Sequence, residues 1–370
     1  MGGIFLELKK KVKKKVIVPN TSTFIKKRIF SLFALLFLVV YTIVLHESLT
    51  ENRVEVPHQK DPCVLYSNQA NDNLKLTLQE LIKSAKSSIS IAIFSLTDDD
   101  IIFLLKKKSQ EGIKVTIVHD AVATQNIAFK LGEDVSLAPR RQKGLMHMKI
   151  IVIDSETIWF GSSNYTKDSL RSYSNLMIGI HSIPFAEYVE QKIFDMQDRK
   201  NKRSFPFYTK MNEESFAFWF LPCGTEPLNL MVSRMNEAKK SIKGAIFTFT
   251  HPQVCQALID AHNRGVAVQI VIDEDSAKNT SSLIFQRLKK SGVPVYISDR
   301  DGLLHHKLMI IDNDCIFTGS ANWTKAAFSQ NDETFCCISD LSQEMQHKLD
   351  LLWETTMNES KGTFSKRKKT

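Results

Sequence analysis

The stretch that decides the fold occurs twice in this chain. Residues 144–166 read GLMHMKIIVIDSETIWFGSSNYT, and residues 302–324 read GLLHHKLMIIDNDCIFTGSANWT. Both copies obey the spacing H-x-K-x4-D-x6-G-S-x-N, so the same polar and glycine positions recur at the same intervals. Such a repeat indicates an internal duplication, with one structural unit in each half of the chain. The recurring residues are His147, Lys149, Asp154, Gly161, Ser162 and Asn164 in the first copy, and His305, Lys307, Asp312, Gly319, Ser320 and Asn322 in the second.

Each copy predicts two short strands. Residues 149–154 and 307–312 are apolar runs bounded by charge. They are too short for helices and rich in β-branched residues, which is typical of buried strands. Residues 158–160 and 316–318 predict a second strand that returns after a polar turn.

The polar residues of each copy are expected to converge beside these strands. Residues two apart on a strand share a face, so His147 and Lys149 should point the same way, as should His305 and Lys307. The Gly-Ser-x-Asn segment then brings backbone N–H groups, a hydroxyl and an amide beside the first strand. One cation, several neutral donors and a histidine together suit a phosphate group.

The rest of the chain repeats one plan around these stretches. Strands that alternate with helices predict an α/β fold. We therefore expect two lobes related by a pseudo-two-fold axis, each a mixed, mostly parallel sheet flanked by helices. The first half predicts strands at 63–68, 88–96 and 114–119 and helices at 74–85 and 100–110; the second half predicts strands at 220–223, 241–249 and 266–272 and helices at 228–238 and 252–263.

The charge of the chain is concentrated at its ends. The net charge is +9, but residues 1–28 carry +8 and residues 361–370 carry +5, so the remainder carries −4. A mildly acidic body is not the electrostatic footprint of a nucleic-acid-binding face.

Residues 29–45 form an uncharged apolar run that predicts a single membrane-spanning helix. Nine basic residues precede it, so the N-terminus is expected in the cytoplasm and the body across the membrane. The alternative is a cleaved signal peptide, which would leave a secreted body. The expected organisation is a basic N-terminus at 1–28, an anchor at 29–45, a tether at 46–60, a first lobe at 61–197, a linker at 198–215, a second lobe at 216–357 and a basic tail at 358–370.

The six cysteines form no C-x-x-C pair, which excludes the usual zinc and thioredoxin-type motifs. Cys315, Cys336 and Cys337 fall in apolar runs and are expected in the core.

At the repeated residues the chain resembles the phospholipase D superfamily, whose hallmark is the same H-x-K-x4-D-x6-G-S-x-N pattern in two copies. The resemblance covers roughly residues 62–355. It implies a phosphodiesterase that needs no metal and no cofactor and that works through a covalent phosphohistidine. One histidine attacks phosphorus, the other protonates the leaving oxygen, and water then reverses the process.

The resemblance also implies roles for the motif residues. Lys149 and Lys307 would hold the non-bridging oxygens and stabilise the charge that grows in the transition state. Asp154 and Asp312 belong to the catalytic motif, but we expect them to fix the strand ends. Asn164 and Asn322, together with Ser162 and Ser320, are expected to bind the substrate phosphate as neutral donors.

A carboxylate that orients a histidine often lies 28 residues after it in this superfamily. Glu333 occupies that place after His305, whereas Asn175 occupies it after His147. A carboxylate favours the imidazolium form of a histidine. The asymmetry therefore predicts His147 as the nucleophile and His305, with Glu333 beside it, as the acid.

The substrate is left open between two classes. The predicted anchor and the absence of a basic body favour a phospholipid. The GSxNWT segment resembles the nuclease branch of the superfamily, which favours DNA or RNA. Cardiolipin synthases resemble this chain in the histidine motif, but they usually carry Gly-Gly where it has Gly-Ser. A non-enzymatic alternative is an inactive protein that binds phosphate esters. No obligate protein partner is implied.

Overall fold

The computed structural model describes residues 33–42, 54, 56–198 and 204–362. The chain divides into two units, residues 1–53 and 54–370, which are described separately here. In the first unit, residues 33–42 are helical. Among the described residues, no helix is long and apolar enough to cross a bilayer. The prediction of a single-pass anchor at 29–45, and of a body held across the membrane or secreted, is therefore wrong. Residues 29–32 and 43–45 lie outside the described residues.

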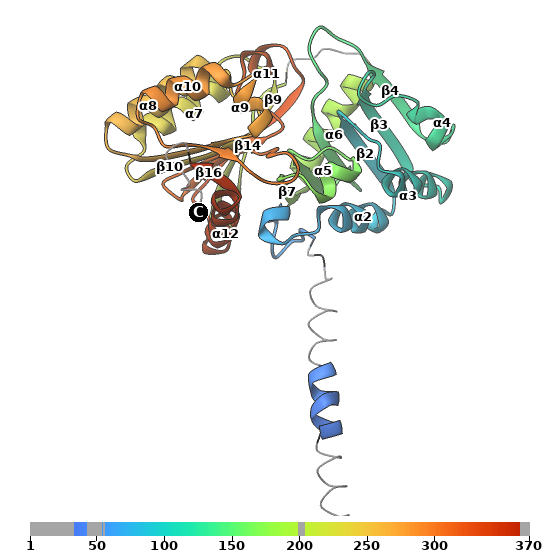
Figure 1. Cartoon of the computed structure of the whole chain (residues 1–370). Coiled ribbons are helices and arrows are strands. Elements are labelled where there is room, and N and C mark those ends of the chain that lie inside the picture. Colours follow the sequence, from blue (N-terminus) through green and yellow to red (C-terminus); the bar gives the residue numbers. More distant parts are fainter. Residues whose placement is uncertain (1–32, 43–53, 55, 199–203, 363–370) are drawn as a thin grey trace, which may run out of the picture. The chain divides into compact units, whose positions relative to one another are not determined.

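The second unit contains two mixed sheets, which confirms the predicted pair of α/β lobes (Figure 1). The first sheet has the order β1 (Cys63–Ser67), β7 (Leu176–His181), β6 (Thr157–Gly161), β5 (Lys149–Ile153), β2 (Ser88–Ile93), β3 (Lys114–Asp120) and β4 (Ser136–Arg140). The second has the order β16 (Ser360–Gly362), β12 (Val295–Ser298), β11 (Ala267–Ile272), β10 (Ser241–Ile246), β13 (Lys307–Ile311), β14 (Cys315–Gly319), β15 (Glu333–Ser339), β9 (Glu214–Leu221) and β8 (Phe207–Met211).

The two sheets share one topology. Read from β9 to β12, the second sheet repeats the order of the first from β1 to β4. Within the described sheets only β2–β3–β4 and β10–β11–β12 pair in parallel, and the other neighbours are antiparallel. The sheets are thus mixed as predicted but mostly antiparallel, because the motif strands return as hairpins rather than through helices.

Two strands extend the second sheet beyond the repeat. Residues 207–211, predicted as linker, form β8 and pair with β9. Residues 360–362, predicted as tail, form β16 and pair with β12.

Helices flank both sheets: α6 and α12 pack in the core between the two sheets, and most of the others pack on the outer faces. In the first lobe these elements are η1 (Asn68–Ala70), α2 (Leu74–Ser84), α3 (Asp99–Gln110), α4 (Ile127–Leu131), α5 (Lys167–Arg171) and α6 (Ile183–Gln197). In the second they are α7 (Glu226–Glu237), α8 (Pro252–Asn263), α9 (Glu274–Lys278), α10 (Ser282–Lys290), α11 (Lys325–Ser329) and α12 (Gln343–Asn358). Figure 1 shows α7, α8 and α10 together on one face of the second sheet.

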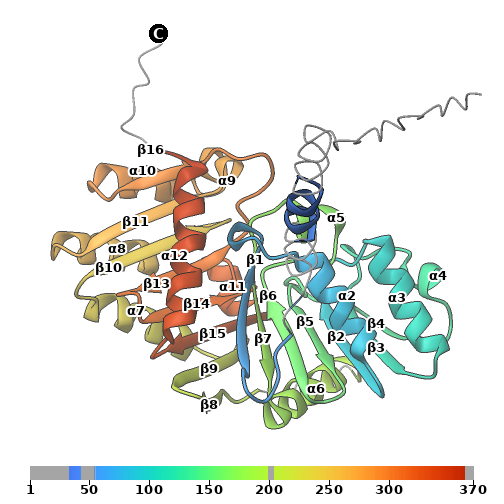
Figure 2. The ribbon, with the colours of Figure 1, turned by 90° about the horizontal axis from the view of Figure 1, so that it is seen from below.

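One apolar core joins the two lobes. Side chains of β5, β6 and β7 pack in the same cluster as side chains of β13, β14 and β15, and α6 and α12 contribute to it. Helix α12 of the second lobe also packs on β1 of the first, beside which it runs in Figure 2. This shared core fixes the two repeated stretches relative to each other.

The three cysteines predicted in the core are buried there, together with two tryptophans of the repeated stretches. Trp159 and Trp323 are fully buried, and Cys315, Cys336 and Cys337 are buried free thiols. The Sγ atoms of Cys315 and Cys337 lie 3.6 Å apart.

Candidate active site

Strands β6 and β14 each end in a glycine that lets two strands meet closely. Gly161 and Gly319 have φ values of 154° and 136°. A Cβ on either would lie 2.3 Å from a carbonyl oxygen, that of Leu176 or Thr334. Because glycine has no Cβ, the following serine N–H reaches the same carbonyl at 3.0 Å in both lobes. This contact brings the Gly-Ser-x-Asn segment against β7 or β15.

Each motif histidine is held by the other lobe. The backbone N–H of His147 donates to the carbonyl of Asp332 at 2.8 Å, and that of His305 donates to the carbonyl of Ser174 at 2.9 Å. The side chains cross in the same way. His147 Nδ1 lies 2.9 Å from a Glu333 carboxylate oxygen, and His305 Nδ1 lies 3.0 Å from Asn175 Oδ1.

The expected pairing of Glu333 with His305 is therefore wrong, because the carboxylate orients His147. Position along the chain indicated which motif Glu333 follows. It did not indicate that β15 delivers the side chain across the interface between the lobes.

The partners fix the tautomer of both imidazoles. Glu333 is a carboxylate that also accepts from Ser320 Oγ at 2.5 Å and from Asn331 Nδ2 at 3.1 Å. Asn175 donates its Nδ2 to the carbonyl of Ser169 at 2.8 Å, so its Oδ1 faces His305. Both partners accept, so both Nδ1 atoms carry the proton. The Nε2 atoms are left for chemistry.

The two lysines lie beside the histidines. Lys149 Nζ donates to the His147 carbonyl at 2.5 Å, and Lys307 Nζ donates to the His305 carbonyl at 2.7 Å. Burial lowers the pKa of Lys149 to about 7, although Glu333 and Asp120 raise it. Burial also lowers the pKa of Lys307, and the charge of Lys149 lowers it further. The two lysines thus repel each other across the lobes, and a bound phosphate would relieve that repulsion.

Burial sets the protonation of the histidines. It lowers the pKa of His147, against which the Glu333 carboxylate raises it. Burial lowers the pKa of His305 well below the usual value, with further lowering by Lys307, Lys149 and His147. His305 lacks a carboxylate partner and therefore gives up its proton more readily than His147.

The two motif serines hold the partners of the histidines. Ser162 Oγ donates to Asn175 Oδ1 at 2.8 Å and accepts from the Leu176 N–H at 3.1 Å. Ser320 Oγ donates to Glu333 and accepts from the Thr334 N–H at 2.9 Å. Both serines are fully buried, so we assign these hydroxyls to positioning in place of the expected contact with phosphate.

The asparagines of the motif are less engaged than the serines. Asn164 Oδ1 is buried and finds no hydrogen-bond partner among the described residues. Asn322 Oδ1 accepts from the Thr248 N–H at 3.3 Å. The role of these two asparagines as neutral donors to phosphate, through Nδ2, stays a prediction.

The motif aspartates bind backbone, as expected for residues that fix strand ends. Asp154 accepts the N–H groups of Lys86, Ser87 and Ser88 at 2.7 to 2.9 Å. Asp312 accepts three N–H groups at the start of β10 over the same range. Burial alone would raise the pKa of each carboxyl, but these hydrogen bonds lower it overall.

Two phenylalanines complete the site and were not predicted as part of it. Phe94 and Phe247 lie against His147 and His305, with ring centroids 4.9 and 5.1 Å apart. The same rings lie 5.0 and 5.1 Å from the ammonium groups of Lys149 and Lys307. The sequence held one signal for them, because Phe94 and Phe247 occupy equivalent positions in the two repeats.

Comparison with known proteins shows which family and which proteins this chain resembles. The family model described as "Cardiolipin synthase, PLD-like domain" matches residues 78–196 and 231–353. A mitochondrial cardiolipin hydrolase from Xenopus laevis is 31% identical over 136 residues, which cover 36% of this chain and 64% of that protein. A phospholipase D from Rickettsia typhi is 30% identical over 42% of this chain and 74% of its own length.

The chain spans 57 to 64% of the length of three of these curated cardiolipin hydrolases. The crystal structure of a phosphatidylserine synthase from Haemophilus influenzae is similar in fold, with a TM-score of 0.66 over 85% of this chain and 90% of that one. Its sequence identity is 16%, so the likeness concerns the fold alone.

Proposed function

Because this chain belongs to the phospholipase D superfamily, we propose that it is a phosphodiesterase that hydrolyses a phospholipid through a phosphohistidine on His147. The observation that carries the proposal is the crossed pair of hydrogen bonds. Each imidazole is held at Nδ1 by a hydrogen bond to a residue of the other lobe. Of these two partners, only Glu333 is charged.

The Glu333 carboxylate supports the assignment of His147 as the nucleophile. When Nε2 bonds to phosphorus and Nδ1 keeps its proton, the ring becomes cationic. The Glu333 carboxylate stabilises that cation, as a carboxylate does for the imidazolium of a catalytic triad. Asn175 offers His305 no such charge, so His305 releases a proton more easily. The sequence predicted the same roles for the two histidines. It did so by placing Glu333 beside His305, whereas the structure places this carboxylate beside His147.

The proposed reaction has two steps. His147 Nε2 attacks phosphorus, the bond from phosphorus to the leaving oxygen breaks, and His305 Nε2 gives its proton to that oxygen. Water then attacks phosphorus and loses a proton to His305, and the bond between phosphorus and His147 breaks. Lys149 and Lys307 stabilise the charge on the non-bridging oxygens in both transition states.

A phospholipid substrate is supported by two observations. Between the basic ends the chain carries a net charge of −4, which disfavours a polyanionic nucleic acid. The relatives named above include cardiolipin hydrolases and a phospholipase D.

The test incubates the protein with phosphatidylcholine vesicles, cardiolipin vesicles or single-stranded DNA, with and without EDTA. We expect phosphatidic acid from the lipids, unchanged by EDTA. Cleavage of DNA alone would replace this proposal with a nuclease, and strict dependence on a divalent metal would contradict the mechanism.

The pH dependence of kcat/KM should have its maximum on the acid side of pH 6.5. The first step needs His147 neutral and His305 protonated. Burial lowers both pKa values in the free protein, so His305 loses its proton below the usual histidine value of about 6.5. Activity towards a short-chain phosphatidylcholine should therefore fall as pH rises towards neutrality. The kcat profile should lie at higher pH, because bound phosphate offsets the two lysines. A kcat/KM maximum above pH 8 would show that the protonation states are assigned wrongly.

A further inference from the structure

Three large apolar side chains of the first lobe are exposed to solvent. Phe129 on α4 is 93% exposed, Val122 in the turn after β3 is 65% exposed, and Leu145 in the turn before β5 is 46% exposed. Single exposed apolar residues are ordinary on a protein surface, whereas a group of them at one place marks an interaction site. The contacts of the segments that carry these three side chains show that they form such a group.

The buried carboxylate of Asp120 joins two of these segments. Its Oδ1 accepts the backbone N–H of Val122 at 2.9 Å. Its Oδ2 accepts the backbone N–H of Met146, the neighbour of Leu145, at 3.2 Å. Because one carboxylate bridges both backbones, Val122 and Leu145 are held close to each other.

A surface cavity of 520 Å³ connects the third side chain to the same region. It is lined by Val122, by Ala128, which precedes Phe129 on α4, and by Arg141 in the turn before β5, among others. The start of α4 therefore borders the same hollow as the two turns that Asp120 joins.

The turn before β5 is attached to the residues that hold the proposed nucleophile. The N–H of Leu145 donates to Asn331 Oδ1 at 3.1 Å, and its carbonyl accepts the N–H of Asp332 at 2.8 Å. Asn331 Nδ2 donates in turn to the Glu333 carboxylate at 3.1 Å, and this carboxylate accepts from His147. The exposed apolar group thus lies at the border of the active site.

Two basic residues lie in the same turn as Leu145. Arg141 and Lys143 are exposed, and neither forms an ion pair with another residue in the part of the chain that the structure describes. Their charges are therefore available to a partner. We call Phe129, Val122, Leu145, Arg141 and Lys143 together the docking rim.

Acidic residues take the equivalent places in the second lobe. Asp275 is exposed at the place of Val122. Asp299 and Asp301 are exposed at the places of the two basic residues, and the Asp299 carboxylate forms an ion pair with Lys361. The two lobes thus present opposite charges at equivalent positions beside the active site.

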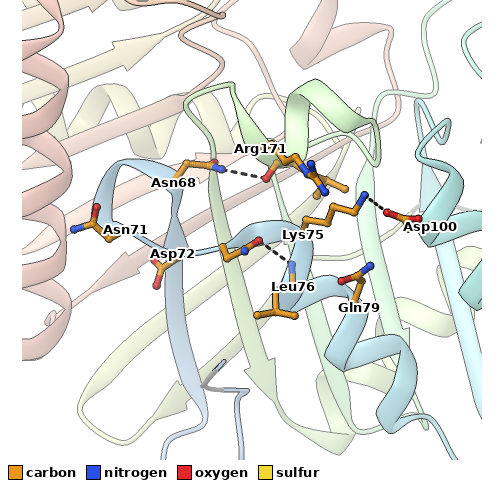
Figure 3. A pocket seen from close by; sticks show the side chains of 10 residues that line it. Asn68, Asn71, Asp72, Lys75, Leu76, Gln79, Asp100 and Arg171 are labelled. Atoms are coloured by element: carbon orange, nitrogen blue, oxygen red, sulfur yellow. Dashed lines mark hydrogen bonds and ion pairs between the residues drawn. The ribbon is translucent and has the colours of Figure 1, made fainter. Parts of the chain in front are cut away.

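The cavity of 440 Å³ where α2, α3 and α5 meet has a different character (Figure 3). There Lys75 bonds to Asp98 and Asp100 at 2.8 and 2.6 Å, so the charge of this lysine is already neutralised. The Asp72 carboxylate pairs with Lys348 at 2.9 Å. None of the strongly exposed apolar side chains of the described residues lines this cavity. Apolar exposure and unpaired positive charge occur together at the docking rim and not here.

We propose that the docking rim binds the surface of an anionic phospholipid bilayer. Phe129, Val122 and Leu145 enter the boundary between headgroups and acyl chains, while Arg141 and Lys143 bind headgroup phosphates. The acidic positions of the second lobe are repelled by the same surface, so the first lobe faces the bilayer. This inference rests on the proposed function, because it explains how a phosphodiester within a bilayer reaches His147.

The composition of the docking rim favours a lipid surface over a nucleic acid. Proteins that bind single strands stack bases on aromatic side chains along a basic groove. The docking rim has one aromatic ring, and its other two apolar side chains are aliphatic. Exposed apolar side chains beside basic residues are the combination that binds the surface of anionic membranes.

Insertion is measured with a tryptophan placed at the docking rim. The four native tryptophans are at most 6% exposed and give a constant background. In a His147→Ala protein, which leaves the lipid intact, Phe129→Trp should be quenched by vesicles of brominated phosphatidylcholine and phosphatidic acid. Leu351→Trp, at an exposed leucine of α12, is the matched control and should not be quenched. Each tryptophan reports its own position, so contacts of other segments with the vesicle do not affect the comparison.

Kinetics on vesicles and on a soluble substrate test whether insertion serves the reaction. The vesicles contain phosphatidic acid and either phosphatidylcholine or cardiolipin, whichever the protein hydrolyses faster. We expect Phe129→Ser to raise the apparent KM for the vesicles about 10-fold. Arg141→Gln should raise it about fivefold, an effect that high salt removes. Both variants should hydrolyse bis(p-nitrophenyl) phosphate normally, and Lys289→Gln, on the exposed face of α10, should change neither activity.

Several results would overturn the docking rim. One is no quenching of the tryptophan at position 129, and another is equal quenching at positions 129 and 351. A third is an Arg141→Gln protein that loses affinity for a single-stranded oligonucleotide but keeps its KM for vesicles, because the basic residues would then serve a nucleic acid. Quenching at position 129 in a protein whose wild type hydrolyses neither vesicles nor bis(p-nitrophenyl) phosphate would support the docking rim and refute the proposed function instead.

Discussion

Replacing His147 with alanine is expected to lower kcat by about 10,000-fold or more, whatever the leaving group. The variant has no nitrogen to bond to phosphorus, and the residual rate reflects only phosphate binding by Lys149 and Lys307. The effect of His305→Ala should depend on the substrate. With an alkyl leaving group we expect a loss of about 100-fold to 10,000-fold, the usual range for a general acid. With p-nitrophenol, which leaves without a proton, the first step should survive.

The measurement pairs each variant with a phospholipid and with bis(p-nitrophenyl) phosphate. His347→Ala is the control, since this histidine is exposed on α12 and remote in sequence from both motifs. Thermal unfolding of every variant checks that the loss is chemical. Full activity in either His147→Ala or His305→Ala would show that the site is misassigned, and equal behaviour of the two variants on both substrates would remove the distinction between nucleophile and acid.

Glu333→Gln should cause the second largest loss, about 100-fold to 10,000-fold in kcat. Three donors converge on the two carboxylate oxygens, from His147, Ser320 and Asn331. A glutamine has only one oxygen, so its NH₂ group must face a donor and disturb the tautomer of His147. It also lacks the charge that stabilises the phosphorylated ring. The comparable change in a catalytic triad costs about 10,000-fold.

A pH profile separates positioning from a general loss of structure in this variant. The carboxylate raises the pKa of His147, so its removal should move the limb of the profile that reports titration of His147 to lower pH. Glu333→Asp should restore part of the activity and return the limb. A Glu333→Gln protein with a normal rate and an unchanged pH profile would refute the proposed role of the Glu333 carboxylate.

Much of the architecture could be predicted from the duplicated stretch. Short apolar runs with β-branched residues specify strands locally, so β5, β6, β13 and β14 lie within a residue or two of their predicted bounds. The repeat itself implied two lobes with one topology. The orientation of the strands was less accessible, because pairing direction depends on contacts distant in sequence.

The pairing of Glu333 was mispredicted for a physical reason. Which histidine receives Glu333 is decided by the packing of two sheets through a common apolar core, and no spacing along the chain encodes it. The polarity of Ser162 and Ser320 suggested contact with phosphate, but burial directs their hydroxyls to Asn175 and Glu333. The predicted membrane span at 29–45 rested on hydropathy alone, which cannot establish the length of a helix.

The covalent intermediate tests the central idea most directly. His305→Ala should react with bis(p-nitrophenyl) phosphate, release one p-nitrophenolate per site in a burst and then stall, because the base that activates water is missing. Digestion at neutral to alkaline pH and mass spectrometry should then find the p-nitrophenyl phosphate group on the peptide that contains His147. A burst without any adduct, or an adduct on His305 in the His147→Ala variant, would contradict a reaction in which the second lobe orients a nucleophile of the first.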